Sequence, residues 1–121
     1  MRAEHIGSGN SAVTIIAIGA DTPGKQEVAV DLLEMVRSSG GKLVADKRQQ
    51  AFTLGDLQHV PKATQDSVTE LGDALVGKSA RREGNEMIFV DLTGVGAQDA
   101  AIAEAAFKAV AVARSPPAAR L

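Results

Sequence analysis

The stretch "VTIIAIGAD", residues 13–21, decides the fold of this 121-residue chain. Its first six residues are apolar apart from one threonine, mostly β-branched, and Gly19 follows them directly. A continuous run of this kind, closed by glycine, is typical of a strand that is buried in a parallel sheet. The turn residues Pro23 and Gly24 come shortly after Asp21, so we expect the chain to leave the sheet there and to turn.

Strands and helices alternate along the rest of the chain. Two more strands are predicted, over residues 43–45 and 87–90. The predicted helices cover residues 26–38, ended by Gly40-Gly41, residues 66 or 67 to 76, ended by Gly77, and residues 94–113, with short helical turns over 47–66. This order predicts an α/β fold. We expect a half-Rossmann arrangement, in which helices flank a short three-stranded parallel sheet that oligomerisation would extend.

The predicted domain organisation has three parts. Residues 1–12 are expected to form a flexible leader, and residues 13–114 a single half-Rossmann-like domain. The pair Pro116-Pro117 ends the last helix, so residues 115–121 are expected to be a loose tail.

The composition argues against several classes of partner. The net charge is −2, aromatic residues make up 2%, and no basic stripe is visible, so we expect no nucleic-acid partner. The chain has no cysteine, and His5 and His59 lie far apart, so we expect no metal site and a cytoplasmic location. No segment has the length of a membrane span, and we expect no membrane partner.

Two glycine patterns could be mistaken for a dinucleotide-binding loop. Residues 7–12, GSGNSA, satisfy G-x-G-x-x-A, but a strand follows them where the fingerprint needs a helix, so we interpret them as leader. Residues 94–99, GVGAQD, do follow a strand and open a helix. Their last position is Asp99, whose charge would repel a phosphate, so a tight turn is favoured and phosphate binding is the alternative.

Asp21 is the first candidate for a functional group. It lies just past the carboxyl end of the predicted strand, the edge of open α/β sheets where ligands bind, and Lys25 follows it. A carboxylate there can transfer a proton when partial burial raises its pKa. The alternative is an aspartate that only hydrogen-bonds the backbone of its own turn.

Two segments, "AIGADTPGKQEV" (17–28) and "MIFVDLTGVGAQDAAIAEAAF" (87–107), together resemble the ornithine cyclodeaminase/μ-crystallin family. The segments "LVADKRQQAFTLGDL" (43–57) and "VTELGDALVGKSARR" (68–82) are similar to it in order and spacing, so the resemblance covers residues 13–114. It implies NAD(P)-dependent enzymes, ketimine reductases, or binding proteins derived from them. Ornithine cyclodeaminase oxidises an amino acid at Cα by hydride transfer, and the imine is then attacked intramolecularly to give proline and ammonia.

The resemblance also implies what this chain lacks. It looks like only the second half of the family's Rossmann domain, strands four to six with their helices. The family's phosphate loop, its acidic ribose-binding position and most of its substrate domain have no counterpart here.

The family's functional positions map onto four residues. Asp21 falls on the aspartate used as catalytic acid/base, and Leu92, Thr93 and Gly94 fall on the segment near the nicotinamide and the substrate. Ile16 stands where the family usually has Asn, and Leu92 where a small Ser is common. These departures argue against retained cofactor binding. We therefore expect no cofactor, with NAD(P) remaining only under the enzyme alternative.

The half domain is expected to self-associate. In the complete family domain the strand at 13–18 would pair with a strand that is absent here, and an unpaired apolar edge invites another chain. The helix over 97–113 is apolar nearly all round, which is typical of a buried helix. A homodimer through this strand edge, this helix or both is predicted. The alternative partner is a separate chain that supplies the missing half.

The leading functional hypothesis is a non-catalytic, self-associating domain that binds a small ligand or a protein at the carboxyl ends of its strands. The predicted ligand-binding residues are Asp21, Lys25, Thr93 and Gly94, in a cleft that also gathers Asp46 and Asp91. The alternative is a subunit or fragment of an NAD(P)-dependent enzyme that uses Asp21 as acid/base. A third interpretation is a shortened chain with no independent role.

Overall fold

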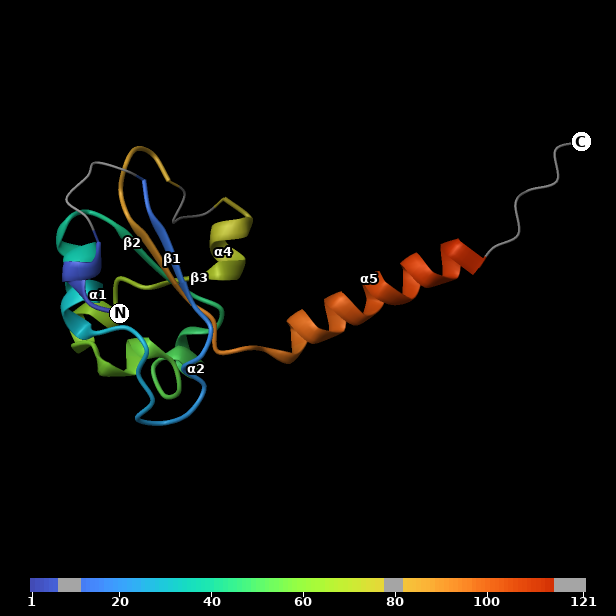
Figure 1. The fold of residues 1–121 in the computed structure, drawn as a ribbon, viewed down its shortest axis with the longest axis horizontal. Coiled ribbons are helices and arrows are strands. Elements are labelled where there is room, and N and C mark those ends of the chain that lie inside the picture. Colours follow the sequence, from blue (N-terminus) through green and yellow to red (C-terminus); the bar gives the residue numbers. More distant parts are fainter. Residues whose placement is uncertain (7–11, 78–81, 115–121) are drawn as a thin grey trace, which may run out of the picture.

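A parallel sheet with helices on both sides forms the body of the computed structural model, which describes residues 1–6, 12–77 and 82–114 (Figure 1). Helix α1 lies on one side of the sheet and α4 on the other, while α5 extends away from the body. The elements, in chain order, are η1 (Ala3–His5), β1 (Thr14–Ala17), α1 (Val30–Ser38), β2 (Lys42–Ala45), α2 (Arg48–Ala51), η2 (Asp56–His59), α3 (Lys62–Gln65), β3 (Thr69–Glu70), α4 (Leu71–Leu75), β4 (Ile88–Asp91) and α5 (Gly96–Arg114).

The strand order is β1-β4-β2-β3, and all neighbouring pairs are parallel. Strand β4 lies between the first two strands of the chain, with Phe89 in register with Ile15 on one side and with Leu43 on the other. Strand β1 is therefore one edge strand of the sheet, and β3 is the other. The predicted α/β fold is confirmed, and the sheet has a fourth strand that the sequence did not predict.

That fourth strand corrects the helix predicted to begin at Asp66 or Ser67. Residues Thr69 and Glu70 instead pair with β2, and helix α4 begins only at Leu71. The Glu70 carboxylate accepts hydrogen bonds from the Lys47 ammonium and from the Arg48 amide, which hold this segment extended beside β2. Gly77 follows the end of α4, as predicted.

The first helix is also shorter than predicted, because its expected first turn is held in a loop. The amides of Glu27 and Val28 both donate to the Asp56 carboxylate, at 2.7 and 2.9 Å, which ties these two residues to η2. Helix α1 begins at Val30 and ends before Gly40.

Residues 1–6, expected to belong to a flexible leader, lie against the body. The Met1 carbonyl accepts a hydrogen bond from the Ala29 amide, and Ala3 and Ile6 pack against the core. The remaining leader residues 7–11 and the predicted tail 115–121 lie outside the described residues.

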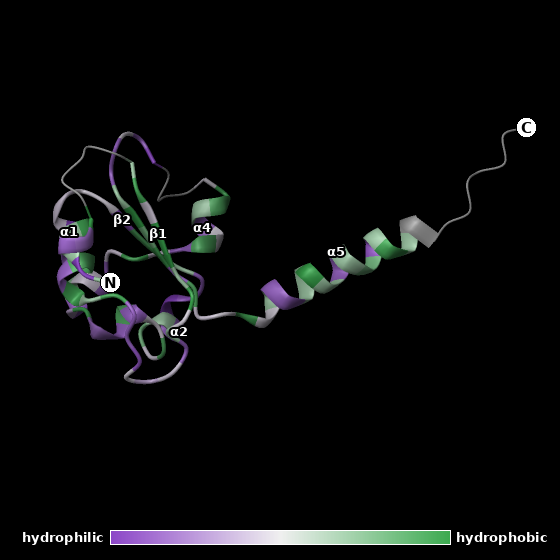
Figure 2. Cartoon of the chain, viewed as in Figure 1, coloured by the Kyte–Doolittle hydropathy of each residue, from purple (hydrophilic) through white to green (hydrophobic). Residues whose placement is uncertain are grey.

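Helix α5 begins at Gly96 and not at Gly94, and it leaves the body without covering the sheet (Figure 1). Every side chain from Asp99 to Ala111 is exposed, including Ile102 at 72% and Phe107 at 75%. Figure 2 shows α5 as one continuous helix, coloured mainly pale to green with a few purple hydrophilic segments. The apolar composition of α5 predicted a buried helix, but within one copy of the chain its side chains from Asp99 to Ala111 are exposed to solvent.

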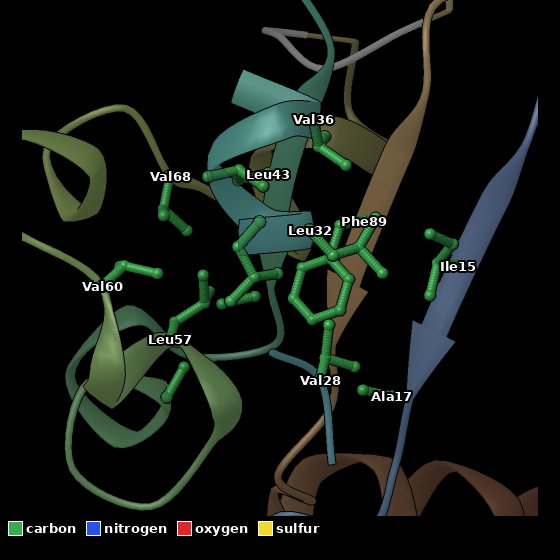
Figure 3. Close-up of a cluster of buried hydrophobic side chains, with 13 residues drawn as sticks. Ile15, Ala17, Val28, Leu32, Val36, Leu43, Leu57, Val60, Val68 and Phe89 are labelled. Atoms are coloured by element: carbon green, nitrogen blue, oxygen red, sulfur yellow. The ribbon is translucent and has the colours of Figure 1, made fainter. Parts of the chain in front are cut away.

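The core lies between α1 and the sheet. Phe89 is fully buried in its middle, with Leu32 of α1 on one side and Ile15 of β1 on the other (Figure 3). Leu57 and Val60, from the segment around η2, close the end of the cluster. This packing fixes the strands whose carboxyl ends carry the polar residues described below.

The second face of the sheet is only half covered. Val44 of β2 is 3% exposed on the side of α4, whereas Ile16 on the same face of β1 is 59% exposed. Ile18 follows on that face and Val90 of β4, in register with Ile16, is half-buried. We call Ile16, Ile18 and Val90 the open half-face.

Candidate functional site

The candidate residues lie at the carboxyl edge of the sheet, because β1, β4 and β2 are parallel and end there together. Asp91 is the last residue of β4, Asp46 follows β2 directly, and Asp21 follows β1 after a short connection. This is the edge at which open α/β sheets bind ligands.

Asp21 and Lys25 form an exposed ion pair. The Lys25 ammonium lies 3.0 Å from Oδ1 of Asp21, and the Thr22 hydroxyl donates to the same oxygen at 3.1 Å. The Lys25 ammonium, followed by the Thr22 hydroxyl, lowers the pKa of the Asp21 carboxyl below its ordinary value. At neutral pH Asp21 is therefore a carboxylate, which can accept a proton but has none to give.

The loop that carries this pair is held at its base and at its tip. At the base, the Glu27 carboxylate accepts a hydrogen bond from the Gly19 amide at 2.8 Å. At the tip, the Gln58 side chain accepts one from the Gly24 amide at 2.7 Å, and the His59 ring lies 2.9 Å from the Lys25 carbonyl. These contacts hold the loop through Glu27, Gln58 and His59. They do not involve the Asp21 carboxylate, which remains exposed at the edge of the sheet.

Asp91 belongs to the interior of the protein and not to an open cleft. It is 1% exposed, and its Oδ2 accepts a hydrogen bond from the Leu57 amide at 2.9 Å. Its Oδ1 has no hydrogen-bond partner among the described residues. Burial, with the nearby negative charges of Asp56 and Asp46 adding to it, raises the pKa of the Asp91 carboxyl to about 6. The side chain thus joins β4 to η2.

Asp46 closes the turn that leads into α5. Its carboxylate accepts hydrogen bonds from the Thr93 hydroxyl at 3.0 Å and from the Gly94 amide at 2.7 Å. The next amide, that of Val95, donates to the Gln98 side chain at 3.3 Å. The Gly94 amide is therefore not free to donate to a bound phosphate.

The structure brings the predicted residues into two groups. Asp21 and Lys25 form one, and Thr93 and Gly94 form the other together with Asp46. Asp91 lies enclosed beneath the edge, so the predicted cleft does not include it as an exposed side chain. The first glycine pattern, residues 7–12, lies outside the described residues except for its last position.

Sequence reasoning missed the segment that supports the loop. Asp56, Leu57 and Gln58 connect β4 to the Asp21 loop, but they lie 29 to 34 residues from the positions they contact. The sequence signal for this segment was the short, mostly polar run "GDLQH" (55–59), which lies between Gly55 and Pro61, two residues that interrupt regular secondary structure. Its role depends on tertiary contacts that no local pattern encodes.

Within residues 1–6, 12–77 and 82–114, no three His, Asp or Glu side chains are grouped closely enough to hold a metal ion. None of the helices described there is both long and apolar enough to cross a membrane.

Comparisons with known proteins identify relatives of this chain. The iminosuccinate reductase of Paracoccus denitrificans (strain Pd 1222) is 37% identical over 94 residues, which are 75% of this chain and 28% of that protein. Its crystal structure in complex with NAD⁺ superposes with a TM-score of 0.70 and 34% identity, covering 86% of this chain and 31% of that one. An archaeal alanine dehydrogenase dimer with bound NAD superposes with a TM-score of 0.72 and 29% identity, over 96% of this chain and 35% of that one.

The chain thus spans about a third of the length of these relatives. Their structures share its α/β, Rossmann-like fold. A profile of the ornithine cyclodeaminase/mu-crystallin family matches residues 1–112, nearly the whole of the chain. This chain therefore belongs to the ornithine cyclodeaminase/mu-crystallin family.

Proposed function

We propose that this chain is a non-catalytic, self-associating domain of its family, which holds a small polar ligand or a protein at the carboxyl edge of its sheet. The observation that carries the proposal is the Asp46 carboxylate in the glycine turn before α5, where it accepts from the Thr93 hydroxyl and the Gly94 amide.

This carboxylate argues against dinucleotide binding by the chain alone. A pyrophosphate group needs free amides at a helix start, and a negative side chain there repels it. The Gly94 amide is engaged by Asp46 and the Val95 amide by Gln98. The Asp46 carboxylate at this turn would repel a dinucleotide phosphate, and no reaction step through NAD(P) follows from these residues.

Two exposed apolar surfaces support self-association. Strand β1 is an edge strand whose Ile16 is 59% exposed, and α5 presents Ile102 and Phe107 to solvent. Surfaces of this kind on a small domain mark places where another chain packs.

The Asp21–Lys25 pair supports ligand binding at the same edge. Its side chains are 60% and 48% exposed, and together they offer one acceptor and one donor to a small polar molecule. An ion pair this exposed contributes little free energy, so a polar ligand could replace either partner with little loss of stability.

A second function is favoured by one specific observation, the 37% identity to iminosuccinate reductase. Under this proposal the chain is a subunit of an NAD(P)-dependent enzyme in which Asp21 is the acid/base and a further polypeptide supplies the phosphate-binding loop. The lowered pKa of Asp21 means that it would accept a proton before donating one.

Titration with NADH, followed by its fluorescence, separates the two functions. We expect no saturable binding by the chain alone up to millimolar NADH. Saturable binding at micromolar NADH would contradict the first proposal and favour the second. The Asp46→Ala variant is the matched comparison, because weak binding gained only by this variant would support the role given to the Asp46 carboxylate.

A further inference from the structure

Helix α5 is apolar around most of its circumference, and its large exposed apolar side chains lie away from its Glu104–Lys108 pair, with Asp99 at the N-terminal end of the same side as these apolar side chains. The Glu104 carboxylate and the Lys108 ammonium form an ion pair at 2.6 Å, one turn apart. Five exposed apolar residues fall on the other side of the helix by their spacing: Ile102, Ala103, Ala106, Phe107 and Val110. We call these five residues the α5 stripe. A helix of this kind buries its stripe against an apolar surface.

Among residues 1–6, 12–77 and 82–114, no helix covers the open half-face, which is an apolar surface. Ile16 and Ile18 are 59% and 74% exposed, while α4 covers only the β2 and β3 side of the same face. In doubly wound sheets a helix packs on each face of the strands. Here the helix that follows β4 leaves the body instead (Figure 1).

Three hydrogen bonds hold the turn between β4 and α5 so that α5 points away from its own sheet. The Asp46 carboxylate binds the Thr93 hydroxyl and the Gly94 amide, and the Gln50 side chain donates to the Gly94 carbonyl at 2.8 Å. Gly94 itself has a φ of +82°, a conformation that favours glycine. Because α5 points away from its own sheet, its stripe does not reach the open half-face of the same copy, and a second copy is the better source of the cover (Figure 1).

The size of the contact distinguishes two ways of pairing two copies. A stable interface buries about 800 Å² per partner, from roughly 20 to 30 residues a side. Helix α5 has 19 residues, and one face of a helix holds roughly half of them, so a pair of α5 helices alone falls short. If each copy contributes both its α5 stripe and its open half-face, the buried surface is larger and the two contacts are related by a twofold axis.

We propose that two copies of this chain exchange their C-terminal helices, with the α5 stripe of each copy packed on the open half-face of the other. The inference rests on the self-association proposed above and names its partner and its surfaces. The Glu104–Lys108 pair stays in solvent in this arrangement, since it lies on the other side of α5.

Sedimentation velocity of the 121-residue chain, from about 1 to 100 μM, tests the exchange. We expect a dimer that is weakened at least tenfold by Phe107→Glu and by Ile16→Glu alike. Ala101→Glu adds the same charge on the side of α5 away from the stripe, so this matched control should leave the dimer intact. A dimer that resists both disruptive variants would overturn the exchange and leave self-association standing, whereas a monomer at every concentration would overturn both.

Cross-linking distinguishes the exchange from simple pairing of α5 helices without relying on disruptive variants. The chain has no cysteine, so I16C and F107C each provide a single thiol. When the two variants are mixed and treated with a short bis-maleimide, we expect unlike pairs to exceed like pairs. Predominant F107C–F107C products would overturn the exchange, as would rapid closure within single chains of the I16C/F107C double variant.

Discussion

The Asp91 carboxylate, at the end of the central strand β4, accepts a hydrogen bond from the Leu57 amide of η2 at 2.9 Å. Within the same segment, Asp56 accepts from the amides of Glu27 and Val28. The position of the loop that presents Asp21 and Lys25 therefore depends on a buried carboxylate far from it in sequence. Three predictions concern this connection.

Replacement of Gly55 by alanine should destabilise the protein. A Cβ atom at Gly55 would lie closer to Oδ2 of Asp91 than non-bonded atoms can approach. We expect the free energy of unfolding to fall by about 1 to 3 kcal/mol, measured by urea denaturation. Gly72→Ala in α4 is the matched control, because nothing lies within 4 Å of that Cβ, and it should be neutral or slightly stabilising. Equal effects of the two substitutions would contradict this packing.

The Asp91→Asn variant should change how stability depends on pH. The pKa of Asp91 is raised from 3.8 to about 6 in the folded protein, so the folded state binds its proton more tightly than the unfolded chain does. The stability from this group is therefore fully present below about pH 4 and is lost as the pH rises through about 6.

Relative to the wild type, Asp91→Asn should thus gain stability between pH 4 and 7.5. Between these pH values, the free energy of unfolding of Asp91→Asn relative to the wild type should rise by about 1 to 3 kcal/mol, since one pKa unit corresponds to about 1.4 kcal/mol. Urea titrations at both pH values give this difference, and the exposed Asp99→Asn serves as the comparison. A difference that is the same at both pH values would mean that Asp91 is not a strained buried carboxylate.

The Lys25→Met variant should raise the pKa of the Asp21 carboxyl toward its ordinary value. The Lys25 ammonium is the main cause of the lowered pKa, and methionine keeps the length of the side chain without the charge. A ¹³C NMR titration of the side-chain carboxyl measures the shift. Lys62→Met, which removes a cation from the Asp66 pair elsewhere, is the control and should leave Asp21 unchanged. An unaltered Asp21 titration in Lys25→Met would contradict the ion pair.

Much of the fold could be predicted from local patterns. The apolar run at 13–18 is strand β1 at Thr14–Ala17, the parallel α/β arrangement is confirmed, and Gly40 and Gly77 follow helix ends as predicted. These features depend on the chemistry of neighbouring residues, which sequence periodicity reports directly.

The errors lie where distant contacts override local preference. Strand β3 has two residues, too few to show any periodicity, and it exists because β2 and Lys47 lie beside it. Helix α1 begins only at Val30, after two residues whose amides donate to Asp56, 29 and 28 residues away. At the site, Asp21 and Lys25 could be predicted from their place after β1, whereas the engagement of Gly94 by Asp46 required the folded sheet.

The Asp46→Ala variant should loosen the turn before α5. It removes the acceptor of the Thr93 hydroxyl and of the Gly94 amide, so amide hydrogen exchange at Gly94 should accelerate at least tenfold. Global stability should fall by about 1 to 2 kcal/mol because hydrogen bonds to a charged group are lost. Asp99→Ala, in the first turn of α5, is the control. Unchanged exchange at Gly94 would show that Asp46 does not hold this turn.

The central claim is that this chain associates with itself and needs no dinucleotide to do so. Its mass in solution, measured by light scattering between about 1 and 100 μM with and without 1 mM NADH, tests the claim most directly. The account predicts a dimer that forms as the concentration rises and is unaffected by NADH. A monomer throughout this range, or a dimer that forms only when NADH is present, would contradict it.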